Sequence, residues 1–558
     1  MNQPAIIERL GRELLFFDGA MGSMLQQAGL PQGTLPERWN VDNPEAVLAI
    51  HAAYAAAGCH ILKSNTFGAN RLKCGEEAPQ LIEAGVALAR RAVRESGRPD
   101  MAVFMDIGPT GKLLAPLGDL AFEDAVSLFA EMAAAGARAG ADGILIETMS
   151  DTYEMKAAVL GAKEATRLPV IATLIFGENG RLLTGGDVPA AVALLEGLGV
   201  DAIGVNCGMG PEQMLALLPA LLSCASVPVA VNPNAGLPRS EGGEVHYDVT
   251  PAQFADVMEK IVREGAWLAG GCCGTTPAHL AAMAARCRGL TPPALTPKRR
   301  TVMASYAGAV TFGGAPVVIG GGIRPGRPMV EQALREGDMD TLVDEGLDEQ
   351  DSGVQVLAVG AGLPGVEESV RLPQAVGALQ GMLRLPLLLE AADPDALEKA
   401  MRVYNGKPLV RPAAGGREAA ERLFPLVKRY GGVAVAAAMD ENGVPQTAEG
   451  RLRIAERLRE EAVRCGIGAE NLLIDPLGPT PGTGPDAETT LETLRRVKRE
   501  LGLKTLLDIT ALSAALTPEA AAALGAAALQ EGVDAVIADP NDEAGRQVMA
   551  AVRARAEA

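Results

Sequence analysis

The stretch "EDAVSLFAEMAAAGARAGA" (residues 123–141), followed closely by "GILIETMSD" (143–151), is one complete helix-and-strand unit. Its first segment is rich in alanine and repeats apolar residues at helical spacing, which predicts a helix that packs on a sheet. Its second segment is a short apolar run that ends in polar residues, which is typical of a buried strand in a parallel sheet. A chain that repeats this unit is predicted to have an α/β fold.

The same unit recurs on both sides of this stretch. Apolar runs that end in polar or glycine-containing turns occur at residues 14–22, 60–70, 102–111, 143–151, 170–180, 202–210, 229–238 and 267–277. Eight β/α units within about 290 residues are the expected content of one (β/α)8 barrel, the TIM-barrel fold. The sequence therefore predicts a first barrel over residues 1–289.

The alternation resumes after one interruption. Residues 290–315 contain several prolines and basic residues, which predicts a linker. Further strand-like runs follow at residues 316–322, 354–362, 385–393, 407–413, 433–443, 471–478, 504–512 and 534–542. We therefore expect an α/β protein of two tandem (β/α)8 barrels, with the linker leading to a second barrel over residues 316–558.

The charge of the chain narrows its possible partners. Its 558 residues include 50 basic and 69 acidic side chains, so the formal net charge is −19. A phosphate backbone or an anionic membrane would repel such a chain, so neither nucleic acid nor a membrane is expected as a partner. The chain has no secretory-signal pattern and no run of about 18 apolar residues, so we expect a cytoplasmic protein. In that compartment cysteines serve metal binding or catalysis more often than disulfides.

Two neighbouring cysteines stand out in "GGCCGTTP" (270–277). Cys272 and Cys273 follow the eighth predicted strand of the first barrel, and Cys207 follows the sixth. The carboxyl ends of all strands meet at one mouth of a barrel, so the three thiols are expected to converge. Three thiolates would leave one tetrahedral position of a zinc ion open to a substrate. Spacing alone leaves open the alternative that these are ordinary buried cysteines.

The motifs "DGAMGSML", "NTFGAN", "DIGPTG", "ETMSD", "VNCG", "NAGLP" and "GGCCGTTP" occur in this order. Together they resemble the homocysteine S-methyltransferase family, and the two-barrel layout resembles the N-terminal half of cobalamin-dependent methionine synthases. The resemblance implies a methyltransferase with zinc held by Cys207, Cys272 and Cys273 and the thiolate of homocysteine as the fourth ligand. A zinc-bound thiol is deprotonated, and its sulfur can attack an electrophilic methyl group.

The resemblance also implies substrate-binding residues at other strand ends of the first barrel, namely Asp18, Asn65, Glu147 and Asn234. Glu147 is expected to bind the ammonium group of the substrate. Carboxylates and amides in these positions also hold loops by bonding backbone N–H groups. That alternative remains open for Asp18 and Asn65.

The second barrel resembles the corresponding barrel of methionine synthases, which binds methyltetrahydrofolate through asparagine and aspartate side chains, but this sequence departs from that pattern. Asparagine is replaced by Arg324, Gly360, Arg411 and Ala511, and aspartate by Ala358 and Glu390. Only Asp475 is retained as a candidate cofactor-binding residue. A pterin ring is held by several hydrogen bonds, each with a net contribution of about 0.5–1.5 kcal/mol, so methyltetrahydrofolate is predicted to bind poorly or not at all.

Two hypotheses remain for the second barrel. Arg324 and Arg411 could bind a different, anionic ligand, because guanidinium groups suit carboxylates and phosphates. Alternatively, the barrel is a scaffold that docks a partner protein, and the two arginines lie on a solvated surface. The scaffold is favoured because the glycine and alanine replacements add no polar chemistry.

The methyl donor is the least constrained part of the prediction. By family resemblance a cobalamin module would carry a histidine that ligates cobalt, but no histidine follows His279. We therefore expect methylcobalamin to be supplied by a separate corrinoid protein. Alternatives are a methyltetrahydrofolate-dependent methionine synthase fragment, direct transfer from a small onium donor such as betaine or S-methylmethionine, and a non-enzymatic zinc- or thiol-binding regulator. The intact strand-end motifs of the first barrel favour an enzyme.

Overall fold

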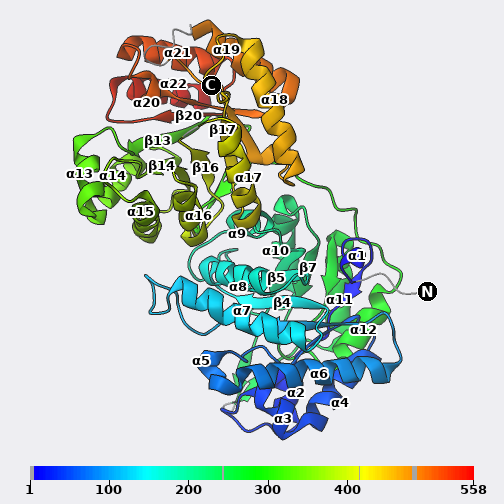
Figure 1. Cartoon of the computed structure of the whole chain (residues 1–558). Helices are drawn as coiled ribbons and strands as arrows, with labels where there is room; N and C mark the ends of the chain where they lie inside the picture. The colour runs from blue at the N-terminus through cyan, green and yellow to red at the C-terminus, as the bar shows by residue number, and fades with distance from the viewer. Residues whose placement is uncertain (1–5, 242–243, 414, 480–486, 558) are drawn as a thin grey trace. The chain divides into compact units, whose positions relative to one another are not determined.

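The computed structural model describes residues 6–241, 244–413, 415–479 and 487–557. The chain divides into two compact units, Met1–Lys298 and Arg299–Ala558, and each is built around a parallel sheet (Figure 1).

The first unit contains an eight-stranded parallel sheet. Its strands are β1 (Leu15–Phe16), β2 (Ile61–Lys63), β3 (Ala102–Ile107), β4 (Gly143–Met149), β5 (Val170–Leu174), β6 (Ala202–Asn206), β7 (Val229–Asn232) and β10 (Ala266–Ala269). They pair in the order β1-β10-β7-β6-β5-β4-β3-β2, and a parallel bridge between Phe17 and Ile61 joins the two ends of this order. Each strand overlaps one predicted run, so the predicted first barrel is confirmed.

Helices cover the outside of the first barrel (Figure 1). The longer ones are α4 (Pro44–Ala56), α6 (Ala78–Ser96), α7 (Phe122–Arg138), α8 (Thr152–Ala165), α9 (Val188–Gly197), α10 (Pro211–Cys224), α11 (Pro251–Glu264) and α12 (Pro277–Cys287). Shorter ones are α1 (Ile6–Arg9), α2 (Gly22–Gln27), η1 (Pro36–Arg38), α3 (Trp39–Asp42), α5 (Arg71–Cys74) and η2 (Gly75–Glu77).

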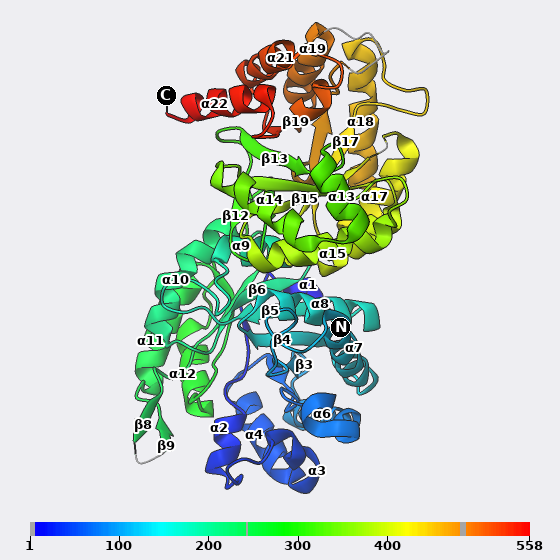
Figure 2. The ribbon, with the colours of Figure 1, turned by 90° about the vertical axis from the view of Figure 1, so that its left-hand side faces the viewer.

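Local sequence explains where these helices begin and end. The helix predicted over 123–141 is α7, and it ends shortly before Gly140, whose φ of 89° is left-handed. Asp151, the last residue of "ETMSD", begins α8 by accepting a hydrogen bond from the amide of Glu154 (3.1 Å). The loop between β7 and α11 carries a hairpin of β8 (Arg239–Glu241) and β9 (Glu244–His246), which extends beyond α11 and α12 in Figure 2.

The second unit is a closed barrel in which β13 pairs with β20. Its strands are β13 (Val317–Ile323), β14 (Val356–Gly360), β15 (Leu387–Ala391), β16 (Leu409–Pro412), β17 (Val433–Ala437), β18 (Leu472–Asp475), β19 (Lys504–Asp508) and β20 (Ala535–Ala538). Each overlaps a predicted run, so the prediction of two barrels is confirmed.

Helices again surround this sheet (Figure 2). They are α13 (Pro328–Glu336), α14 (Met339–Asp351), α15 (Glu368–Met382), α16 (Pro394–Val403), α17 (Arg417–Tyr430), α18 (Ala448–Arg464), η3 (Ala469–Asn471), α19 (Ala487–Arg496), η4 (Val497–Leu501), α20 (Ile509–Leu512), α21 (Pro518–Gln530) and α22 (Glu543–Glu557). None of the described helices is apolar over a sufficient length to cross a membrane.

The range 290–315, expected to be a linker, includes a short hairpin. Its strands β11 (Val302–Ala304) and β12 (Ala309–Thr311) pair antiparallel. The amide of Ala304 donates to the carbonyl of Lys407 (2.8 Å), and Met303 is fully buried in the core of the second barrel. The hairpin therefore belongs to the second unit, whose first residue is Arg299.

Candidate metal centre

The three cysteines singled out in the sequence meet at the carboxyl ends of the strands of the first barrel. Cys207 directly follows β6, and Cys272 and Cys273 follow β10. Their sulfur atoms all lie within 4.8 Å of one another, and those of Cys207 and Cys273 are 3.8 Å apart. Cys272 is buried, whereas the other two are half-buried. Two loops that are distant in sequence thus bring together three thiols that could hold one metal ion.

Backbone conformation shapes both cysteine loops. Cys207 has a left-handed φ of 57°, which costs a non-glycine residue about 1–3 kcal/mol and is concentrated at functional sites. Its amide is held by the carbonyl of Asn232 (3.1 Å). In the other loop, a Cβ atom at Gly270 would lie 2.6 Å from the Cβ atom of Phe17, so the loop before Cys272 has no room for a larger residue.

The thiols interact strongly with one another. Hydrogen bonds from Cys207 and Cys272 lower the pKa of Cys273 to about 3. Hydrogen bonding with the other two raises the pKa of Cys207 far above its usual range. The cluster therefore stabilises one thiolate readily and a second one poorly. A divalent cation would favour ionisation of all three, because metal binding to cysteine releases protons.

A buried ion pair lies at the same mouth. Lys63 ends β2, and its Nζ atom is 3.5 Å from each carboxylate oxygen of Glu147, which lies on β4. The Lys63 ammonium is also 3.5 Å from the carbonyl oxygen of Gly271, next to the cysteine pair. Burial raises the pKa of Glu147 to about 7. The carboxylate predicted to bind the substrate ammonium is therefore already paired with a cation of the protein.

Asp18 and Asp106 add two more buried acids. One oxygen of Asp18 accepts the backbone N–H of Lys63 (3.0 Å), whereas its Oδ1 atom has no hydrogen-bond partner among the described residues. Burial raises the pKa of Asp18 to about 7 and that of Asp106 well above its usual range. Asp18 thus serves in part the loop-holding role that the sequence left open. Its Oδ1 atom, which is buried without a partner among the described residues, still requires a hydrogen-bond donor.

The amide of Asn65 is used to hold a neighbouring segment. Its Nδ2 atom donates to the carbonyl of Pro36 (2.8 Å) and to Oδ1 of Asn40 (2.9 Å). Asn40 in turn donates to the carbonyl of Asn65 (2.8 Å). Asn65 therefore holds a loop, although it does so by donating to a carbonyl and a side-chain oxygen and not by accepting a backbone N–H.

Asn234 lies between the two cysteine loops. Its backbone N–H donates to the carbonyl of Met209 (3.0 Å), and the backbone N–H of the next residue, Ala235, donates to the carbonyl of Cys273 (2.9 Å). The side chain is buried, and its Oδ1 atom has no hydrogen-bond partner within the described part of the chain. A buried acceptor of this kind is normally satisfied by a ligand or by water.

Sequence reasoning missed Lys63, Asp106 and Tyr247. Burial and the charge of Cys273 raise the pKa of Tyr247, which packs against Gly274 beside the cysteine pair. Only Lys63 gave a clear signal: it is a charged residue within the apolar run "HILKSN", and a lysine is almost never buried unless it is paired.

The second barrel places Arg324 and Arg411 in ion pairs. Their side chains are 12% and 15% exposed, and both contact Asp508, at 2.9 and 2.8 Å. Arg411 also contacts Asp475 (2.9 Å). The hypothesis that the two arginines lie on a solvated surface is therefore wrong, because acidic partners far away in the sequence enclose them.

Comparison with known proteins agrees with this arrangement. Residues 15–287 match the family model described as homocysteine S-methyltransferase. Residues 15–287 are a homocysteine S-methyltransferase family domain. Residues 329–539 match a second family model, described as pterin binding enzyme. The family resemblance carried by the motifs of the first barrel is thereby confirmed.

Curated relatives extend over both domains. The methionine synthase of Mycobacterium tuberculosis is 30% identical over 570 residues, which cover 95% of this chain and 48% of that protein. The methionine synthase of Mycobacterium leprae is 30% identical over 577 residues, again 95% of this chain and 48% of the relative. The chain therefore spans about half the length of these curated relatives, both of which are named methionine synthases.

Solved structures similar to the chain include the homocysteine methyltransferase MmuM from Escherichia coli. Its metallated form is 27% identical, with a TM-score of 0.43, and the match covers 49% of this chain and 96% of that one. Its apo form is also 27% identical, with a TM-score of 0.42, and the match covers 50% and 98% of the two chains.

Proposed function

We propose that the chain is a zinc-dependent homocysteine S-methyltransferase of the methionine synthase type, which forms methionine with a methyl group delivered by methylcobalamin on a separate corrinoid protein. The observation that carries the proposal is the convergence of Cys207, Cys272 and Cys273 within 4.8 Å at the mouth of a barrel that matches the homocysteine S-methyltransferase family. No other described group of three or more cysteine, histidine or acidic residues is close enough to share an ion.

The donor set fits zinc. Two sulfurs bound to one tetrahedral zinc ion, each at about 2.3 Å, are about 3.8 Å apart. The sulfurs of Cys207 and Cys273 are separated by 3.8 Å. Thiolates are soft ligands that select zinc over magnesium or calcium, and three of them leave one position for a substrate sulfur. Zinc, when bound, supplies the positive charge that holds the homocysteine thiol in its nucleophilic, deprotonated form.

The charged residues of this mouth suit the rest of the substrate. Glu147 offers a carboxylate for the ammonium group, and Lys63, which also contacts the carbonyl oxygen of Gly271 before the cysteine pair, holds that carboxylate in place. The unpartnered Oδ1 atoms of Asp18 and Asn234 are further acceptors. With methylcobalamin as donor, the homocysteine sulfur would bond to the methyl carbon as that carbon leaves cobalt, which would keep the electron pair of the broken bond.

A separate methylcobalamin donor is supported by the second barrel. Asp475, the one pterin-binding candidate that the sequence retains, is paired with Arg411 (2.9 Å) and is not open to a ligand. A pterin bound at that position would therefore lack the carboxylate that holds its ring. A donor from outside the chain needs no such site.

A donor comparison tests the proposal. The zinc-loaded chain is incubated with homocysteine and with free methylcobalamin, methyltetrahydrofolate plus cobalamin, or betaine, and methionine is measured. We expect methionine from methylcobalamin alone, with loss of activity after zinc removal and recovery after zinc is returned. Equal activity without zinc would overturn the metal assignment, and methionine from betaine would overturn the corrinoid donor.

A further inference from the structure

The mouth of the second barrel contains a cavity of about 500 Å³. Small residues leave this space open: Gly321, Gly360, Gly362, Ala391, Ala413 and Ala511 all lie on its wall. The volume is within the range of sites for small molecules, about 300–1,000 Å³. Size therefore does not exclude a pterin, and the fit depends on the polar groups at the base of the cavity.

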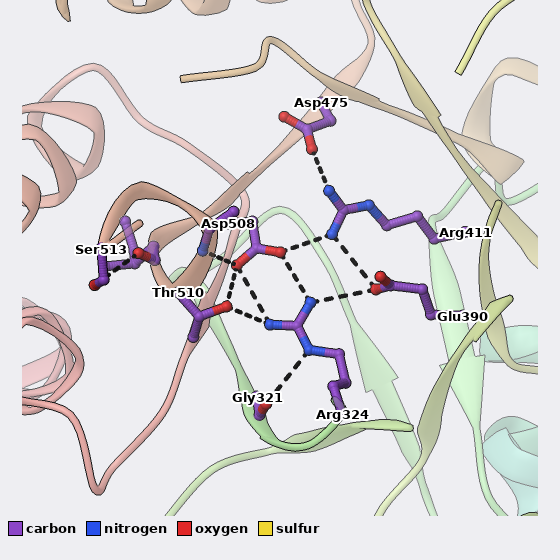
Figure 3. A network of polar contacts seen from close by, with 10 residues as sticks. Gly321, Arg324, Glu390, Arg411, Asp475, Asp508, Thr510 and Ser513 are labelled. Atoms are coloured by element: carbon purple, nitrogen blue, oxygen red, sulfur yellow. Dashed lines mark hydrogen bonds and ion pairs between the residues drawn. The ribbon is translucent and has the colours of Figure 1, made fainter. Parts of the chain in front are cut away.

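The base of the cavity is a ring of alternating charges (Figure 3). Arg324 and Arg411 both point toward the carboxylate of Asp508, at 2.9 and 2.8 Å. Glu390 contacts both guanidinium groups from the other side, at 3.2 Å from Arg324 and 3.6 Å from Arg411. Asp475 completes the set with a 2.9 Å hydrogen bond from Arg411.

Asp508 has no accepting position left for a ligand, and Asp475 is already bonded through both of its oxygens. Asp508 accepts from both arginines through Oδ2, and its Oδ1 atom accepts from the hydroxyl of Thr510 (2.6 Å) and the amide of Ala511 (3.2 Å). Asp475 accepts from Arg411 through one oxygen and from the amide of Leu477 (2.8 Å) through the other. An ionised carboxylate offers about four acceptor positions, and those of Asp508 are filled.

A guanidinium group and a pterin present the same donors. The ring edge of a 2-amino-4-oxopteridine is a cyclic guanidine, whose ring N–H and amino group point side by side toward a carboxylate, as two N–H groups of arginine do. Arg411 divides its two terminal nitrogens between two carboxylates, one on Asp508 and one on Asp475. The protein's own guanidinium thus already donates to both of the carboxylates that this edge of a pterin could use.

We infer that the second barrel does not bind a pterin, because Arg324 and Arg411 occupy the carboxylates that such a ligand would need. The residues of this mouth therefore do not fit the group implied by the matched family model. An uncharged pterin that displaced Arg411 would leave the buried guanidinium without a partner, and it would supply no positive charge to compensate the acids that it bonds.

Direct titration of the full chain with 5-methyltetrahydrofolate tests the inference without any assay of methyl transfer. Isothermal calorimetry to about 1 mM ligand should show no saturable binding. A dissociation constant in the micromolar range would overturn the inference. Because homocysteine is absent from this experiment, its result does not depend on the proposed function of the first barrel.

A paired substitution tests the cause. Arg324→Asn with Arg411→Asn frees Asp475 and Asp508, so the double variant should bind 5-methyltetrahydrofolate at least about tenfold more tightly than the unmodified chain. Arg417→Asn is the matched control, because Arg417 is 74% exposed and pairs only on the surface with Glu421. A folded double variant that binds no better than this control would show that the arginines do not block the site.

A single substitution provides a second test if the double variant does not fold. Arg411→Ala removes one guanidinium, and methylguanidinium ions should occupy its place on Asp475 and Asp508. They should then raise the melting temperature of this variant more than that of Arg417→Asn, because ligand binding to the native state stabilises it. Equal shifts in the two variants would contradict the assignment of Arg411 as the group that fills the site.

Discussion

The ammonium nitrogen of Lys63 lies 3.5 Å from both carboxylate oxygens of Glu147, and the two side chains are only 8% and 5% exposed. Burial alone would lower the pKa of Lys63, but Glu147 and Asp18 raise it well above its usual range. Lys63 is therefore the permanent cation of a site that otherwise gathers acids and thiols. Its charge offsets the negative charge that three cysteine thiolates would bring.

Lys63→Met should destabilise the first barrel and weaken substrate binding. Removing one partner of a buried ion pair leaves the other uncompensated, which costs about 3 kcal/mol. Glu147 would then be protonated near neutral pH and would no longer attract an ammonium group, so KM for homocysteine should rise about tenfold with a smaller change in kcat. Lys63→Arg keeps the charge and is the control. Unchanged stability and KM in Lys63→Met would contradict this role.

The stability of the zinc-free chain should fall as the pH rises from about 4.5 to about 7. Burial raises the pKa of Glu147 from 4.5 to about 7. The native state therefore holds this proton more tightly than the unfolded state, so the contribution is fully present below pH 4.5 and is lost as the pH rises through about 7. One pKa unit corresponds to about 1.4 kcal/mol, so the loss is about 3 kcal/mol.

Denaturant unfolding of the zinc-free chain at acidic and alkaline pH measures this loss. Glu147→Gln cannot titrate and should reduce the pH dependence, and the part that remains is shared by the other buried acids, among them Asp18, whose pKa burial raises to about 7, and Asp106, whose pKa burial also raises. If the free energy of unfolding changed equally with pH in Glu147→Gln and in the unmodified chain, Glu147 would not be the titrating group.

The sequence was sufficient to predict the two barrels because each strand is a continuous apolar run that ends in polar or glycine residues. It was also sufficient to bring Cys207 and the Cys272–Cys273 pair together, since all strand ends of a barrel share one mouth. The hairpin of β11 and β12 escaped prediction because its strands are only three residues long, too short for any period to be visible.

The arginines of the second barrel could not be placed from sequence for a different reason. Arg411 and Arg324 precede their shared partner Asp508 by 97 and 184 residues. An arginine without an acidic residue nearby in the sequence is predicted to be exposed, and the ion pairs become visible only when the barrel closes and brings Asp508 next to both arginines. The polar contacts of Asn65 and Asn40 are likewise set by the path of the chain between them.

Gly270→Ala should disturb the metal centre through packing. The added methyl group would lie 2.6 Å from the Cβ atom of Phe17 and 2.7 Å from Oδ1 of Asn232, inside the closest normal contacts. Overpacking of this kind costs about 1–3 kcal/mol and would shift the loop that carries Cys272 and Cys273. Gly22→Ala is the matched control, because nothing lies within 4 Å of a Cβ atom there. Zinc content and melting temperature should both fall in the first variant and remain unchanged in the second.

Serine at Cys207, Cys272 or Cys273 should remove zinc without unfolding the barrel. A hydroxyl is a poor substitute for a thiolate ligand, and loss of a direct ligand should lower zinc affinity and methyl transfer by more than about 100-fold, beyond the effect of a residue that only supports a ligand. The hydrophobic core of the barrel is formed by other side chains, such as Phe17, Phe104 and Leu145, so the melting temperature of the zinc-free protein should change little.

Zinc analysis after dialysis checks this expectation, with Cys465→Ser in the second barrel as the control for loss of a half-buried thiol. We expect one zinc ion per chain in the control and almost none in the three variants. Full zinc content in Cys273→Ser would exclude the triad as the metal site, because the 3.8 Å separation of the Cys207 and Cys273 sulfurs is the dimension on which the fit to zinc rests.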